Sequence, residues 1–362
     1  MEMRHFNIYF RQDGRFEGRI SKGKCRNGKR KFQYFFGHTR EEVLDKMAKT
    51  QHNEVLQTQC TKTVSQLFKE WYRSIQHRVK ESTAANYLMK AQKHILPNFG
   101  DKLVSSLVSD DIYDFIEVKK SEGLSNRYVS DIIILIKSVF KYAVRTYHIF
   151  NPMDAVTLPK KKTSEIQLLD EKEQQKLQQY LSKNQNNTTL GIALSMSTGI
   201  RIGELCALQW DDIDLEKRIL TVRKTIQRIQ CSTENVKTKL IITEPKSESS
   251  RRMIPIPECI VDFLKSFKGK SKEYLISGEE KPVEPRTMQY RFAKVLKNVK
   301  LPSVHFHALR HMFASNCVKL GFDIKSLSEI LGHSSVEITL NRYVHSSFEQ
   351  KASYMKRLKL AV

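Results

Sequence analysis

The chain has 362 residues, of which 40% are hydrophobic, so it can bury the cores of two or three domains and is too apolar to be disordered. It carries 62 lysines and arginines against 39 acidic residues, a formal net charge of +23. This balance favours a polyanionic partner such as nucleic acid over a surface that is merely solvated. No apolar run approaches the roughly 18 residues that a membrane-spanning helix needs, so no membrane association is expected.

The six cysteines are scattered at positions 25, 60, 206, 231, 259 and 317, and no two form a C-x-x-C pair. This spacing argues against a disulfide framework and against a cysteine zinc site, and it is typical of a reducing compartment. Charges interrupt the opening MEMRHFNIYF before any signal-peptide core can form, so we expect a soluble cytoplasmic protein.

Residues 1–55 predict a small three-stranded sheet followed by one helix. The runs FNIYF and KFQYFF alternate, Gln12-Asp13-Gly14 is a hairpin signal, and Thr39 with Glu42 forms a capping box that opens a helix toward Lys49. One sheet face is expected to be apolar, with Phe6, Ile8, Phe10, Phe16, Ile20, Phe32, Tyr34 and Phe36. The other face is expected to carry His5, Asn7, Tyr9, Arg11, Arg15, Arg19, Lys31 and Gln33.

The second face of this sheet is basic, because residues 1–40 hold 11 lysines and arginines against 3 acids. A basic three-stranded sheet fits the major groove of DNA, where arginine and amide side chains can reach base edges. The predicted DNA contacts are Tyr9, Arg11, Arg15, Arg19, Lys31 and Gln33. The alternative is a basic face that is only solvated.

The stretch GKCRNGKR in this segment matches most of the phosphate-binding loop G-x-x-x-x-G-K-[ST]. Arg30 stands where a serine or threonine should bind magnesium, and a strand-like run follows where a helix should begin. No nucleotide is therefore expected as a cofactor.

Residues 62–157 predict a compact bundle of at most five helices with short connections. Apolar residues follow helical spacing in the segments 64–75, 83–95, 108–123 and 126–145. Pro97 and Gly100 are expected to close the second of these helices. The run PKKKTSE marks a linker at about residues 156–165.

Residues 166–362 predict a mainly helical domain with a small antiparallel sheet. Helices are expected at 171–183 and 189–197, followed by the strand-like runs RILTVRKT and LIITEPK…RRMIPIP, and then by helices to the carboxyl end. Lys246 is expected at the exposed edge of a β-hairpin. The predicted fold class is therefore multidomain α+β.

Residues 305–311 read HFHALRH, in which His307 and His311 share one helical face, as in some zinc hydrolases. Arg310 is permanently charged and would repel a metal dication, and the stretch contains no acid. Arginine beside histidine suits an anion such as phosphate better. The structural alternative, a histidine hydrogen-bonded in a core, is favoured for His305 and His311 and stays open for His307.

Two further motifs hold residues that suit an anion. STGIRIGEL places Arg201 at the amino end of a helix, where the helix itself favours negative charge; the alternative is an arginine paired with Glu204. LGHSSVEITLNRYVH places His333 ten residues before Tyr343.

In order and spacing, the motifs T-G-x-R-x-G-E, a hairpin lysine, H-x-x-R-H, L-G-H-S and a final tyrosine resemble the tyrosine recombinase (phage integrase) family. The resemblance covers residues 166–350, which are similar to the family's catalytic domain. More loosely, residues 62–157 look like its core-type DNA-binding domain, and residues 1–55 look like the arm-type domain of integrases from conjugative transposons and temperate phages. Three residues, Lys246, Lys239 and Lys237, remain candidates for the family's catalytic lysine.

The resemblance implies a role for each motif residue in the attack of Tyr343 on a DNA phosphodiester. Arg201 and Arg310 would bind the non-bridging oxygens, His307 would act as acid/base, His333 would hydrogen-bond the phosphate, and Lys246 would protonate the leaving 5′ oxygen. It implies double-stranded DNA with core and arm sites as partner, a homo-tetramer on DNA, an accessory excision or DNA-bending factor, and neither metal nor nucleotide.

Three other functions remain as alternatives. A type IB topoisomerase shares the chemistry, a DNA-binding regulator could carry an inactive site, and a metallohydrolase could use the histidines. The carboxyl-terminal stretch FEQKASYMKRLKL is a candidate for docking on a neighbouring subunit, with packing on its own subunit as the alternative.

Overall fold

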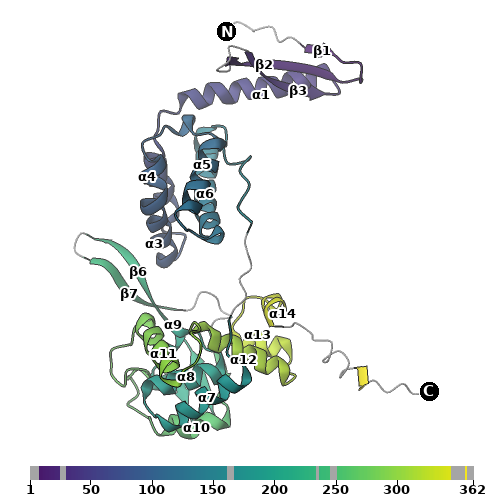
Figure 1. Ribbon diagram of the computed structural model, residues 1–362. Helices are drawn as coiled ribbons and strands as arrows, with labels where there is room; N and C mark the ends of the chain where they lie inside the picture. Colours follow the sequence, from purple (N-terminus) through teal and green to yellow (C-terminus); the bar gives the residue numbers. More distant parts are fainter. Residues whose placement is uncertain are drawn as a thin grey trace. The chain divides into compact units, whose positions relative to one another are not determined.

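The computed structural model describes residues 8–24, 30–160, 167–233, 236–244, 251–343 and 355–356. The chain divides into two compact units, Met1–Thr163 and Ser164–Val362, and Figure 1 shows small antiparallel sheets among many helices. The predicted α+β fold class is therefore confirmed. None of the described helices has the length and apolar character that crossing a bilayer requires.

The first unit begins with a sheet of order β1-β2-β3, covered by one helix. Its elements are β1 (Ile8–Phe10), β2 (Phe16–Lys24), β3 (Arg30–Gly37) and α1 (Arg40–Gln59). As predicted, the Thr39 hydroxyl accepts a hydrogen bond from the Glu42 backbone N–H at 3.1 Å. The helix is longer than expected, and its Val43 and Met47 are fully buried against one face of the sheet.

The phase of β3 differs from the predicted one. Gln33 pairs with Ile20, which packs against α1, whereas Tyr34 pairs with Arg19 and Phe36 with Glu17. The prediction that Gln33 shares the basic face with Arg19 is therefore wrong, as is the assignment of Phe32, Tyr34 and Phe36 to the covered face. The alternation in KFQYFF is ambiguous because both of its phases contain aromatic residues, and a shift of one residue moves every side chain to the other face.

A helical bundle follows within the same unit. Its elements are α2 (Val64–Ile75), α3 (Glu81–Lys90), the π-turn η1 (Ala91–Ile95), α4 (Leu96–Phe99), the 3₁₀ turn η2 (Val104–Ser106), α5 (Ser109–Ser121) and α6 (Asn126–Tyr147). The buried face of α6 packs on α2 and α5, and Phe140, Ile112 and Leu67 are completely inaccessible in this core.

Pro97 does not close its helix, because the helical path continues to Phe99 through a π-turn. In this turn the backbone N–H of Leu96 bonds to the carbonyl of Ala91, five residues back. Proline is tolerated in the first turn of α4, where a missing N–H costs little. The wider π-turn therefore accommodates a residue that the sequence pattern treats as a stop.

The second unit is mainly helical, with two small sheets. Its helices are α7 (Glu171–Lys183), α8 (Asn187–Thr198), α9 (Ile202–Cys206), α10 (Glu258–Lys265), α11 (Pro285–Val299), α12 (His307–Lys319), α13 (Ile324–Leu331) and α14 (Val336–Tyr343), with the 3₁₀ turn η3 (Trp210–Asp212). Its strands are β4 (Ile213–Asp214), β5 (Ile219–Val222), β6 (Thr225–Thr233), β7 (Val236–Thr243) and β8 (Arg252–Pro255).

The strand pairing corrects the predicted hairpin. LIIT belongs to β7, which pairs with β6, whereas RMIP is β8 and pairs with β5. The two runs therefore lie in different sheets. In the chain, the long hairpin of β6 and β7 is inserted between β5 and β8, which are neighbours in the other sheet (Figure 1). An alternating pattern marks a strand but does not determine its partner. Lys246 lies outside the described residues.

Candidate functional site

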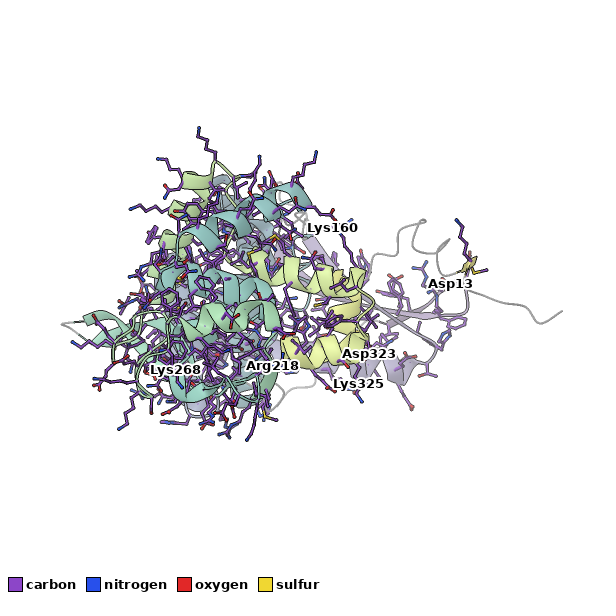
Figure 2. All side chains as sticks on the ribbon, turned by 90° about the horizontal axis from the view of Figure 1, so that it is seen from below. Asp13, Lys160, Arg218, Lys268, Asp323 and Lys325 are labelled. Carbon is purple, nitrogen blue, oxygen red and sulfur yellow. The ribbon has the colours of Figure 1, made fainter. Side chains whose placement is uncertain are left out.

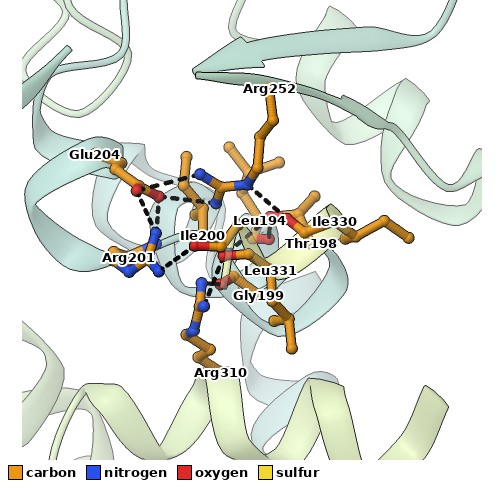
Figure 3. Close-up of polar contacts among 11 residues, drawn as sticks. Leu194, Thr198, Gly199, Ile200, Arg201, Glu204, Arg252, Arg310, Ile330 and Leu331 are labelled. Atoms are coloured by element: carbon orange, nitrogen blue, oxygen red, sulfur yellow. Dashed lines mark hydrogen bonds and ion pairs between the residues drawn. The ribbon is translucent and has the colours of Figure 1, made fainter. Parts of the chain in front are cut away.

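Arg201 and Arg310, far apart in sequence, meet at the carboxyl end of α13 (Figure 3). Nη2 of Arg310 donates to the carbonyl of Leu331 at 2.6 Å, and Nη2 of Arg201 donates to the next carbonyl, that of Gly332, at 2.7 Å. The last carbonyls of a helix lack intrahelical partners and carry partial negative charge, so they bind cations well. The structure thus brings the two predicted anion-binding arginines together.

The glycine of the T-G-x-R motif makes this meeting possible. Gly199 ends α8 with φ +65°, and a Cβ there would lie 2.5 Å from a ring atom of Phe313 and 2.9 Å from the side chain of Leu331. Only glycine combines this left-handed conformation with so close an approach. The Gly199 carbonyl accepts a hydrogen bond from Nη1 of Arg310 at 2.8 Å, so the turn also orients the second arginine.

Glu204 holds Arg201 from the other side. Its carboxylate accepts hydrogen bonds from the backbone N–H of Arg201 at 3.1 Å and from Nη1 of the same residue at 2.8 Å. The alternative interpretation of Arg201, an arginine paired with Glu204, is therefore correct as a contact. It does not bury the guanidinium, because the Arg201 side chain stays 34% exposed while that of Glu204 is 4% exposed.

A third arginine, Arg252 at the start of β8, completes the cluster. It donates to both carboxylate oxygens of Glu204, at 3.2 and 2.9 Å, and its Nε donates to the carbonyl of Ile330 at 2.6 Å. Burial by itself raises the pKa of Glu204, but the charges and hydrogen bonds of Arg252 and then of Arg201 outweigh it, so the pKa lies below its usual range. Glu204 is therefore a buried anion at neutral pH. We call Arg201, Arg252, Arg310 and Glu204 the arginine cluster.

The two histidines of the H-x-x-R-H motif have different environments. His307, the first residue of α12, is exposed, whereas His311 is 5% exposed, and their rings meet edge to face with centroids 4.8 Å apart. Within the described ranges, no three His, Cys, Asp or Glu side chains gather closely enough to hold a metal ion. The exposed His307 stands about one helical turn before Arg310 on α12.

His333 and Tyr343 bracket α14, which packs against α12 and α13. Nδ1 of His333 lies 2.8 Å from Oγ1 of the fully buried Thr339, and this contact fixes the plane of the imidazole. Tyr343 is the last residue of α14, and its side chain lies outside the described part of the chain. Helix packing thus carries the tyrosine backbone to the helices that bear the arginine and histidine motifs.

The lysine remains open. Lys239 lies on β7, where it pairs with Ile229, and its side chain is exposed. The side chain of Lys237 and all of Lys246 lie outside the described residues. The choice among the three stays a prediction.

Sequence reasoning missed Arg252 and Thr339. A signal for Arg252 exists in the strand RMIP, because Arg252 and Ile254 are buried whereas Met253 and Pro255 are exposed. An arginine at the inward phase of a strand needs an anionic partner inside the fold. Thr339 gives no such signal, because a buried threonine in a helix is common.

The open face of the N-terminal sheet carries both arginine and aromatic side chains. The guanidinium carbon of Arg19 lies 5.5 Å from the ring centroid of Tyr9 and 5.2 Å from that of Phe32. Arg11 and Arg15 lie 5.5 and 5.9 Å from the centroid of Phe36. Four of the six predicted DNA contacts thus belong to two cation–π clusters, one around Arg19 and one around Phe36. Gln33 does not belong to this face, and the side chain of Lys31 lies outside the described residues.

Two family models match the chain. Residues 167–350 match the Phage integrase family, and residues 63–119 match the Phage integrase, N-terminal SAM-like domain. A "Tyrosine recombinase XerC-like" protein of Caldanaerobacter subterraneus subsp. tengcongensis is 27% identical over 371 residues, with 94% of each chain covered. The transposase from transposon Tn916 of Enterococcus faecalis is 23% identical, covering 78% of this chain and 73% of its own.

Two solved structures share the fold of this chain. The Tn1549 transposon integrase in complex with transposon right end DNA superimposes with a TM-score of 0.67 at 25% identity, covering 82% of this chain and 99% of that one. A lambda integrase tetramer bound to a Holliday junction shares the fold, with a TM-score of 0.60 at 19% identity and with 94% and 97% of the two chains covered.

Proposed function

The chain belongs to the phage integrase family of tyrosine recombinases, and on this premise we propose that it cuts and rejoins DNA at specific sites to integrate and excise a mobile genetic element. The observation that carries the proposal is the meeting of Arg201 and Arg310 on consecutive carbonyls beside the helix that ends in Tyr343. Two guanidiniums so placed suit the non-bridging oxygens of one phosphodiester.

In the proposed reaction the Tyr343 hydroxyl attacks the scissile phosphorus. A bond forms between the tyrosine oxygen and phosphorus, the bond from phosphorus to the 5′ oxygen breaks, and a 3′-phosphotyrosine and a 5′ hydroxyl result. His307 takes the phenol proton, and Lys246, or else Lys239 or Lys237, gives a proton to the leaving 5′ oxygen. His333 hydrogen-bonds a phosphate oxygen.

The arginines stabilise the charge that grows on the phosphate oxygens. Arg310 is 2% exposed and its guanidinium is fixed by two carbonyls, so it is desolvated and oriented before DNA binds. Preorganised donors of this kind act strongly because little reorganisation accompanies the reaction. Side-chain cations thereby supply the electrostatic stabilisation, and the proposed reaction uses neither a metal nor a nucleotide cofactor.

The covalent intermediate conserves the energy of the broken backbone bond, so a 5′ hydroxyl from another duplex can attack it and reseal the strand. Two such exchanges between two duplexes need four active sites, which supports a homo-tetramer on DNA. Lambda integrase, which shares the fold, forms a tetramer on a Holliday junction. We further propose an accessory excision or DNA-bending factor and a cytoplasmic location.

Each part of the chain has a proposed share in DNA binding. Residues 1–55 would bind arm-type sites through the open sheet face, residues 62–157 would bind core sites, and residues 166–362 would carry the chemistry. The stretch FEQKASYMKRLKL, proposed to dock on a neighbouring subunit, lies almost entirely outside the described residues.

The decisive experiment traps the covalent intermediate. A DNA substrate with a nick beside the cleavage site loses the short strand that carries the 5′ hydroxyl, so resealing fails and the protein stays attached. A covalent adduct at the 3′ end of the break is expected. Relaxation of supercoiled plasmid that lacks the element's sites would instead support a type IB topoisomerase, and absence of any adduct would support a DNA-binding regulator.

Binding to DNA is expected to weaken steeply with salt. The net charge is +23, and exposed basic side chains occur in both units, for example Lys160 in the first and Arg218, Lys268 and Lys325 in the second (Figure 2). A protein that makes about 6–10 phosphate contacts loses about 10³–10⁵ in affinity between 50 and 200 mM salt. Titration of labelled core-site DNA across this range measures the slope, and a flat response would contradict phosphate-dominated binding.

Arg19→Ala is expected to weaken arm-site binding without changing cleavage at the core site. Arg19 is exposed and contacts the rings of Tyr9 and Phe32, and loss of one base-contacting arginine costs about 1–3 kcal/mol. Lys49→Ala is the matched control, because this exposed residue belongs to α1, which covers the opposite face. Equal effects of both changes on arm-site affinity would argue for a merely solvated face.

A further inference from the structure

Building on the proposed recombinase activity, we propose that Arg252 is a positioning residue that neutralises Glu204, so that the charge of Arg201 remains available to the scissile phosphate. The residue belongs to none of the family motifs that the sequence displays. Among the described residues, its hydrogen bonds link it to Glu204 and to the carboxyl end of α13.

Arg201 and Arg252 share the carboxylate of Glu204. Oε1 of Glu204 accepts from Nη1 of Arg201 at 2.8 Å and from Nη1 of Arg252 at 3.2 Å. Oε2 accepts from the backbone N–H of Arg201 at 3.1 Å and from Nη2 of Arg252 at 2.9 Å. Each oxygen is therefore divided between the two arginines, as Figure 3 shows.

The arginine cluster contains three guanidiniums and one carboxylate, a formal charge of +2. Without Arg252 the buried Glu204 would face Arg201 as its single cationic partner in the cluster, and the pair would be neutral toward an incoming phosphate. Because opposite charges interact strongly where water is excluded, Arg201 would also be drawn toward Glu204.

Exposure and hydrogen bonding together separate the roles of Arg201 and Arg252. The Arg252 side chain is 6% exposed, whereas that of Arg201 is 34% exposed. Arg201 can thus reach a ligand at the surface, whereas Arg252 directs Nε to the carbonyl of Ile330 and both Nη atoms to Glu204, and so lies behind the carboxylate. The bond from Nε of Arg252 to the carbonyl of Ile330 places a third arginine beside the carbonyls that Arg310 and Arg201 hold. It ties β8, the strand that follows the segment containing Lys246, to the same helix end.

The test compares cleavage of two nicked substrates that differ in one substituent on the scissile phosphorus. In the second substrate a methyl group replaces one non-bridging oxygen of the scissile phosphate, which makes it neutral. Arg252→Met is expected to lower the single-turnover cleavage rate on the natural phosphate by about 100-fold, as for other lost electrostatic stabilisers. On the neutral substrate, the decrease in cleavage rate that Arg252→Met causes relative to wild type should be at least tenfold smaller. The reason is that a neutral phosphate develops less negative charge for the arginines to stabilise.

A double variant checks the charge argument on the protein side. Glu204→Gln in the Arg252→Met background removes the unbalanced carboxylate, so it should raise the cleavage rate of the natural substrate at least tenfold above that of Arg252→Met alone. Arg252→Lys keeps the charge and is expected to cleave faster than Arg252→Met. It also serves as the test variant should Arg252→Met fail to fold. Core-site affinity and melting temperature are measured for every variant.

Arg223→Met is the matched control. Arg223 also pairs with a buried carboxylate, Asp212, at 3.5 Å, but it makes no contact with the arginine cluster in the described structure. It should cleave both substrates at close to the wild-type rate.

Equal losses on both substrates, together with no gain from Glu204→Gln, would overturn the role of Arg252 and show a purely structural arginine. If the wild-type protein formed no adduct on the natural substrate, the recombinase activity itself would fail, and the role of Arg252 with it. The two failures are therefore distinct.

Discussion

Tyr343→Phe is expected to abolish covalent attachment to DNA while leaving core-site affinity unchanged. The substitution removes only the hydroxyl, and Tyr343 ends α14, the helix that packs against α12 and α13. A phenol has a pKa near 10 and is a poor nucleophile at neutral pH, so its reaction depends on the arginine and histidine side chains around the phosphate. Denaturing gel electrophoresis after incubation with the nicked substrate measures the adduct.

A second tyrosine provides the control for this change. Tyr290 on α11 is 62% exposed, and its hydroxyl accepts a hydrogen bond from Arg286 at 3.1 Å. Tyr290→Phe should form the adduct at the wild-type rate. An adduct that persisted in Tyr343→Phe would refute the assignment of the nucleophile, and peptide mapping of that adduct would identify the residue that carries the DNA.

Arg310→Ala is expected to lower the cleavage rate by about 10²–10³, by analogy with the loss of one oxyanion donor. The guanidinium is buried and held by the carbonyls of Gly199 and Leu331, so it meets the phosphate already desolvated and oriented. Arg310→Lys keeps a charge but cannot hold two carbonyls with one planar fork, so it should remain well below wild type. Single-turnover cleavage of the nicked substrate gives both rates.

Arg310→Ala also removes the two buried hydrogen bonds from Arg310 to the carbonyls of Gly199 and Leu331. The effect of this substitution on stability must therefore be separated from its effect on the cleavage rate. Leaving buried carbonyls unpaired costs about 1–3 kcal/mol. Met312→Ala is the matched control, because Met312 lies in the same helix and is also 2% exposed, and truncation of a buried methionine costs about 2–5 kcal/mol. If Met312→Ala slowed cleavage as much as Arg310→Ala, the loss would come from folding and not from phosphate binding.

Local patterns in the sequence predicted most helices and the positions of the functional motifs. The apolar spacing of residues 64–75 and of residues 171–183 matches the bounds of α2 and α7, because an amphipathic helix depends on neighbours three and four residues apart. The Thr39 cap is likewise local. The family resemblance is confirmed by the match over residues 167–350, since it depends on the spacing of a few residues.

Non-local contacts decided the remaining features. The phase of β3 follows from which aromatic residues α1 covers, and the partner of β8 follows from the sheet that it joins. The alternation of apolar and polar residues along a strand determines neither the phase of β3 nor the partner of β8. The same alternation fits either face of the sheet and any neighbouring strand.

The sequence by itself determined the family and most of the helices, because motifs and helical periodicity depend on residues that lie close together in the chain. The roles of the catalytic candidates stay predictions. Only the tertiary structure decided that Glu204 is shared between Arg201 and Arg252, and that three arginines meet three successive carbonyls at the end of α13. A buried charge selects its partners by proximity after folding, and residues that lie close in space need no fixed spacing in sequence.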